Sequence, residues 1–133
     1  MLSGLPPYAP TGELLPENIE KTARYIAQCG VSEKVVIHCK QAGFCLDCAT
    51  GKFTCVPSLP VPKEEIRGSV GAGDAFCAGT LFGILHGFSD EKTLSFAAGA
   101  AACSLFAENS VDAMRPANEI EALIERLGFT TIS

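Results

Sequence analysis

The chain has 133 residues, of which 47% are hydrophobic and only 19% are charged, so its length fits one domain that is richer in apolar residues than most soluble domains. The formal net charge of −5, without any cluster of Lys and Arg, excludes a surface built to bind nucleic acid. No apolar run is long enough to cross a bilayer, and no basic-then-apolar signal follows Met1, which predicts a cytoplasmic protein that binds no membrane.

The first half of the chain predicts one helix followed by short strands. Residues 1–12 are rich in turn formers and predict an irregular segment. A helix is expected from Pro16 to Gly30, because apolar residues recur there at helical spacing. Residues 35–39 (VVIHC) predict a buried strand, which we assign to a parallel sheet because a helix precedes it. Residues 41–43 predict a turn.

A hairpin and three helices are predicted for the rest of the chain. Residues 44–48 and 52–56 predict the two hairpin strands, and the prolines in 57–65 predict an extended connector. Helices are expected over 74–86, over 90–109 after the capping residue Ser89, and from about Pro116 to Gly128. This order indicates part of an α/β sandwich. The two central helices need cover on more than one face, so the chain is expected to be a piece of a larger sheet protein.

Seven cysteines, mostly within apolar segments, raise the question of disulfides or metal. Free, packed thiols are the expectation, because no export signal is present. The alternative is a cysteine-based metal or redox protein, since Cys45 and Cys48 form C-x-x-C near Cys39, Cys55 and His38. On a regular strand, residues three apart point to opposite faces, which argues against one ion shared by Cys45 and Cys48.

One short stretch carries the chemistry: residues 67–83 read RGSVGAGDAFCAGTLFG. Gly71 and Gly73 permit a tight turn into a helix, whose first N–H groups have no partner inside the helix and suit phosphate oxygens. Asp74 stands at the rim, where a carboxylate can accept a proton from an attacking hydroxyl while the amides stabilise charge on a transferred phosphoryl group. The alternative from the residues alone is that Asp74 only caps a helix behind a glycine turn.

Residues 68–87, GSVGAGDAFCAGTLFGILHG, resemble the second signature of the ribokinase-like (PfkB) carbohydrate kinases, usually Asp-Thr-x-Gly-Ala-Gly-Asp-x-Phe-x-(Ala/Ser)-Gly. The resemblance continues through VVIHCKQAGFCLD, the hairpin, the connector and FAAGAAACSLF, and so covers the chain from about residue 13. It implies an α/β fold: the C-terminal part of a three-layer α/β/α sandwich, with a mostly parallel sheet and a hairpin, forming a single partial domain over residues 1–133.

The resemblance also implies roles for single residues. Asp74 matches the catalytic base that contacts the substrate hydroxyl, and Gly71, Ala72 and Gly73 match the anion hole. ATP and Mg²⁺ are the implied cofactors, the metal being bound mainly with the nucleotide, and no residue of this chain is assigned as a metal ligand. The implied nucleotide-binding positions are His38, Lys40, Gly43, Gly73 and Ala98.

The chain departs from the family pattern in three ways. Gly68 and Ser69 replace the usual Asp-Thr, whose Asp often serves a monovalent-cation site, so potassium activation does not follow from the resemblance. Lys40 replaces a loop glycine, and Ala98 stands where many members carry a polar residue near adenine. The chain is also less than half as long as the family's members. We therefore expect a truncated, nucleotide-side portion that is inactive alone or binds ATP weakly, and whose uncovered apolar surface favours association, such as a homodimer.

The expected function is ATP-dependent phosphorylation of a hydroxyl on a sugar or sugar-like molecule. Fructose phosphates, ribose, nucleosides and ketodeoxy sugar acids all remain open as substrates. Two alternatives remain: a non-catalytic nucleotide- or phosphate-binding module, and the cysteine-based metal or redox protein.

Overall fold

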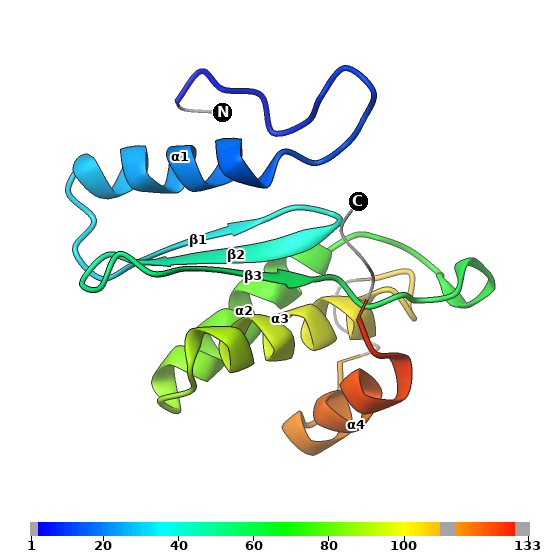
Figure 1. Ribbon diagram of the computed structural model, residues 1–133. Helices are drawn as coiled ribbons and strands as arrows, with labels where there is room; N and C mark the ends of the chain where they lie inside the picture. Colours follow the sequence, from blue (N-terminus) through cyan, green and yellow to red (C-terminus); the bar gives the residue numbers. More distant parts are fainter. Residues whose placement is uncertain (1–2, 110–113, 130–133) are drawn as a thin grey trace.

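The computed structural model describes residues 3–109 and 114–129, which form three layers (Figure 1). Helix α1 (Pro16–Gln28) covers one face of a sheet formed by β1 (Lys34–His38), β2 (Ala42–Asp47) and β3 (Phe53–Pro57). Helices α2 (Ala72–Leu85) and α3 (Asp90–Ser104) lie on the other side, and α4 (Ala117–Leu127) packs against α3. A short 3-10 helix, η1 (Lys63–Glu65), lies in the connector between β3 and α2. None of the helices in the described ranges is both long and apolar enough to span a membrane.

The described strands form an antiparallel sheet of order β1-β2-β3. The pairing of His38 with Gly43 ends the β1–β2 ladder, and β2 and β3 form the predicted hairpin. The prediction that residues 35–39 belong to a parallel sheet is wrong for every described pairing. Residues 39–41 are too short for the crossover that a parallel partner needs, so β1 reverses directly into β2. For the same reason the predicted turn at 41–43 lies earlier, at 39–41.

Alternate residues of β2 build two separate cores. Phe44 packs with Leu14 and Ile19 on the α1 side, whereas Cys45 packs with Phe76 and Leu94 on the other side. This division follows from the period of two in a strand. It confirms that neighbouring positions in β2 serve different layers.

Several element bounds differ from the sequence prediction, and three differences bear on the site. Helix α2 begins at Ala72, not at 74, because Gly71 adopts a left-handed conformation (φ 85°) and the following residues are already helical. Helix α3 ends at Ser104, and the Leu105 carbonyl accepts a hydrogen bond of 2.7 Å from the Arg67 amide. The connector is not wholly extended, since the three residues of η1 follow its last proline, Pro62, and are free to form a turn.

Lys34 ties the sheet to the helical layer. Its Nζ atom contacts Asp90 Oδ1 at 2.5 Å, at the first residue of α3, and Asp47 Oδ2 at 3.8 Å. The hydrogen bond to Asp90 raises the pKa of Lys34 above its usual value. The start of α3 is thereby anchored to the start of β1.

Candidate active site

The turn that leads into α2 leaves main-chain amides open. Gly71 has φ 85° and ψ 1°, and its carbonyl accepts the first helical hydrogen bond, from the Ala75 amide at 2.8 Å. The Ala72 amide makes one long bond of 3.4 Å to the Ser69 carbonyl. Among the described residues, no hydrogen-bond acceptor is found for the amides of Gly71 and Gly73. These N–H groups stand at the positive end of a helix, which suits an anion.

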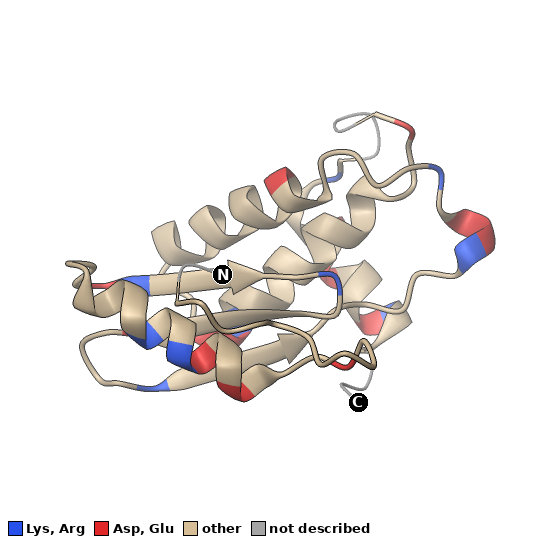
Figure 2. Cartoon of the chain, turned by 90° about the horizontal axis from the view of Figure 1, so that it is seen from above, with Lys and Arg blue, Asp and Glu red and all other residues tan. Residues whose placement is uncertain are grey.

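Asp74 is an exposed residue in the first turn of the same helix. It is the only charged residue of α2, whose remaining surface carries no blue or red in Figure 2. No ion pair or hydrogen bond engages its carboxylate within residues 3–109 and 114–129. The exposed Asp74 carboxylate and the open amides of Gly71 and Gly73 thus occur within four consecutive residues at the start of one helix.

The loop between β1 and β2 meets this helix through Phe76. The imidazole ring of His38 stacks on the Phe76 ring, with centroids 4.1 Å apart and an interplanar angle of 7°. A Cβ atom added to Gly43 would be 2.5 Å from Cζ of Phe76, so only glycine fits there. His38 as a residue is exposed, but the protein atoms around its ring partly desolvate the imidazole, which lowers the pKa of His38 below its ordinary value. Two of the predicted nucleotide-binding residues thus adjoin the helix that bears Asp74.

Two other predicted nucleotide-binding residues, Lys40 and Ala98, differ in solvent exposure. Lys40 is exposed at the tip of the loop, and its carbonyl accepts a 2.8 Å hydrogen bond from the Ser58 hydroxyl. Ala98 is only 6% exposed and packs in a core cluster that includes Leu59 and Ala75. The fold therefore brings His38, Lys40 and Gly43 to one loop, whereas the Ala98 side chain contacts protein atoms.

Phe76 and Ser58 are the two residues of this region whose place the sequence did not indicate. Phe76 is only 3% exposed, and its contacts with His38 and Gly43 arise from the tertiary structure. The available signal was its position, two residues after Asp74. Ser58 stands in the connector, and its link to Lys40 depends on long-range folding.

The cysteines do not gather into a metal site. No group of three or more His, Cys, Asp or Glu side chains suited to a metal is found among the described residues. Every cysteine is a free thiol. Burial raises the pKa of Cys45 to about 11, so that its thiol stays protonated at neutral pH. The thiols are free, as expected, and Cys45 and Cys103 are buried. The expectation that the thiols are packed is wrong for Cys29 and Cys77, which are exposed at the end of α1 and on the outer face of α2.

The sequence matches the model of the pfkB family carbohydrate kinases over residues 9–117. The chain belongs to this family. A curated relative, "5-dehydro-2-deoxygluconokinase" of Shouchella clausii, is 32% identical over 80 residues, which is 56% of this chain and 24% of the relative. The family prediction is thereby confirmed.

Solved structures of the ribokinase fold superpose on most of the chain. A putative Ribokinase II from E. coli matches with a TM-score of 0.70 at 22% identity, over 80% of this chain and 33% of that one. A putative Ribokinase II from E. coli in complex with ATP and Mg²⁺ matches with a TM-score of 0.66 at 21% identity, over 84% and 33%. The fold is ribokinase-like, and the pfkB chain spans about a third of the length of these structures and about a quarter of the curated relative.

Proposed function

We propose that this pfkB chain forms the nucleotide-side part of an ATP-dependent kinase that phosphorylates a hydroxyl of a sugar or sugar-like substrate. The observation that carries the proposal is the turn at 71–74, where unpaired amides and a free carboxylate share one helix end. An anion hole without a base would only bind phosphate, and a base without an anion hole would leave the transferred charge unstabilised.

Each part of the turn has its own role. The amides of Gly71, Ala72 and Gly73 donate to the oxygens of the phosphoryl group and stabilise the charge that grows on them. The Asp74 carboxylate accepts the proton of the attacking substrate hydroxyl. ATP, when bound, supplies the phosphoryl group, and Mg²⁺ offsets the charge of its phosphates. Because Asp74 is exposed, a substrate can reach its carboxylate without a movement of α2.

The nucleotide lies, in this proposal, along the loop that joins β1 and β2. Gly43 lets the backbone pass close to Phe76, and the exposed Lys40 supplies a positive charge for phosphate. The ring of His38 borders the path from the loop to the anion hole. Ala98 has no direct part, because its methyl group is enclosed in the core.

The surroundings of Gly68 do not complete a monovalent-cation site. Gly68 faces the carbonyl oxygens of Ala107 and Glu108, each 3.1 Å from the place where its Cβ would stand. Those oxygens suit a cation, but no carboxylate at 68 completes the set. We therefore propose that the enzyme has no potassium requirement at this position.

For the substrate we propose a deoxy keto sugar acid or its close analogue. The support is the name shared by the curated relatives, 5-dehydro-2-deoxygluconokinase. A cytoplasmic setting, where ATP and sugar acids coexist, fits this chemistry.

The test uses the chain joined to the N-terminal part of the Shouchella clausii relative, so that a full-length kinase is assayed. Asp74→Asn should lower phosphoryl transfer by about 10²- to 10⁴-fold while Mg-ATP affinity stays within about threefold, because the amide side chain cannot accept the proton. Glu91→Gln, in the first turn of α3, is the matched control and should change neither quantity.

Three outcomes would count against the proposal. Unchanged transfer in Asp74→Asn would assign catalysis elsewhere, and Mg-ATP binding without transfer in the parent protein would favour a binding module. Zinc near one equivalent per chain, in protein purified without chelator, would favour a metal protein.

A further inference from the structure

We propose that Phe76 is a positioning residue, which holds the anion-hole turn at a fixed place relative to the loop between β1 and β2. This inference rests on the proposed function, because it concerns how the two halves of the nucleotide site are kept in register. Phe76 touches neither nucleotide nor substrate in the proposal. It acts through Gly43, His38 and the backbone of its own helix.

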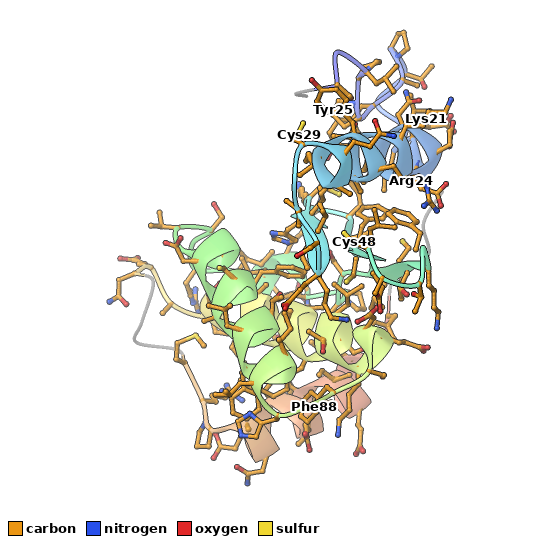
Figure 3. All side chains as sticks on the ribbon, turned by 90° about the vertical axis from the view of Figure 1, so that its left-hand side faces the viewer. Lys21, Arg24, Tyr25, Cys29, Cys48 and Phe88 are labelled. Carbon is orange, nitrogen blue, oxygen red and sulfur yellow. The ribbon has the colours of Figure 1, made fainter. Side chains whose placement is uncertain are left out.

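The position of α2 makes such a link necessary. Helix α2 packs mainly on α3, and α3 rather than α2 carries most of the contacts with β2 and β3. Seen from the side, α2 lies on the outer side of α3, and its far face is uncovered (Figure 3). The first turn of α2 therefore has little direct contact with the sheet except through Phe76.

The Phe76 ring contacts both strands at the last pair before their loop. One face of the ring lies parallel to His38 of β1 at 4.1 Å, and its edge fills the space that a side chain on Gly43 of β2 would need. His38 and Gly43 are directly paired in the ladder. The ring is also enclosed by the Leu94 and Cys45 side chains, and only 3% of Phe76 is exposed. These contacts hold the Phe76 ring in place between α2 and the sheet.

Backbone hydrogen bonds transmit that position to the anion hole. The Phe76 carbonyl accepts a 2.9 Å bond from the buried Thr80 hydroxyl, and the preceding amide, that of Ala75, bonds Gly71 O at 2.8 Å. Only Ala75 separates Phe76 from Asp74. A shift of the ring would therefore move the open amides and the carboxylate together, away from the loop. Misplacement by about 1 Å costs up to about 10²-fold in rate in well-organised sites.

The test compares two buried phenylalanines, Phe76 of α2 and Phe44 of β2. Phe76→Leu shortens the positioning ring, and Phe44→Leu is the control. Phe44 is also fully buried, but it stacks on Phe53 at 5.8 Å and faces α1. Both variants should lose stability. At equal folded fraction, only Phe76→Leu should weaken Mg-ATP binding by this chain, by about 10-fold or more. Only this variant should speed exchange of the Ala75 amide, which is protected by its bond to Gly71 O.

A compensating pair separates positioning from packing. Gly43→Ala alone should weaken Mg-ATP binding, because the methyl group displaces the Phe76 ring. Added to Phe76→Leu, the same change should restore part of the binding, because the methyl group then occupies vacated space. Wild-type affinity and wild-type exchange of the Ala75 amide in Phe76→Leu would overturn the inference. If neither the parent chain nor its full-length fusion to the N-terminal part of the Shouchella clausii relative binds Mg-ATP, the proposed nucleotide site fails, and the exchange comparison still decides whether Phe76 holds the turn.

Discussion

Gly79 of α2 lies so close to Ala97 of α3 that a Cβ atom on Gly79 would stand 2.8 Å from the Cα of Ala97. The two helices therefore meet backbone to backbone at this point. Farther along the pair, Gly83 faces the Thr93 side chain, which a Cβ on Gly83 would approach to 2.7 Å. Small residues on one face of α2 allow this contact, and that close approach sets where the turn at 71–74 stands.

Gly79→Ala should destabilise the protein by about 1–3 kcal/mol, because the added methyl group collides with backbone that cannot move aside. Gly73→Ala, in the same helix, is the control: nothing lies within 4 Å of its added Cβ, so it should be neutral or stabilise slightly. Urea unfolding of both variants measures the difference. Equal stabilities would show that the helices separate at little cost.

The outer face of α2 should drive self-association. Leu81 and Leu85 lie one helical turn apart and are 62% and 82% exposed. The double variant Leu81→Lys/Leu85→Lys should sediment as a monomer at concentrations where the parent chain associates. Val31→Lys, an exposed apolar site outside α2, should behave like the parent. Identical sedimentation of the parent and the double variant would rule out this face as the contact.

Thiol reactivity should follow burial. Cys29, labelled at the end of α1 in Figure 3, and Cys77 are exposed, whereas Cys45 and Cys103 are buried and have raised pKa values. In native protein, an aromatic disulfide reagent should modify Cys29 and Cys77 first, and Cys45 and Cys103 only on unfolding. The double variant Cys29→Ser/Cys77→Ser should lack the fast phase. Rapid reaction of every thiol would contradict the packed cores around β2 and α3.

Stability should fall in mild acid because of His38. Its pKa is lowered from 6.5 in the folded state by burial, so the unfolded chain takes up a proton at a higher pH than the folded chain does. The free energy of unfolding should therefore decrease as the pH falls below about 6.5, and level off below the folded-state pKa. His38→Phe keeps a ring on Phe76 but cannot be protonated, so this part of the decrease should vanish. Urea unfolding at about pH 7.5 and about pH 5.5 brackets the titration of histidine. An equal loss of stability in both proteins would assign the decrease to carboxylates instead.

The features that arise from local chemistry could be predicted from the sequence. Helical spacing predicted α1 and α4, the capping residue Ser89 predicted the start of α3, and the turn chemistry around 49–51 predicted the hairpin. The glycine turn that leads into α2 just before Asp74 was also predicted, because glycine conformation and helix polarity are properties of a few adjacent residues. The signature that identifies the family lies in the same short stretch.

The contacts between these elements could be read only from the folded chain. The antiparallel pairing of β1 depended on where the chain turns, which the predicted turn missed by two residues. The burial of Ala98, the link between Ser58 and Lys40, and the contacts of Phe76 with His38 and Gly43 all join residues far apart in the chain. The hydrophobic effect is not directional. The apolar composition of α2 therefore predicted that the helix is packed against other elements, but not which of its faces contacts α3. That choice follows from steric fit between the two helix backbones, and steric fit is a property of the folded chain.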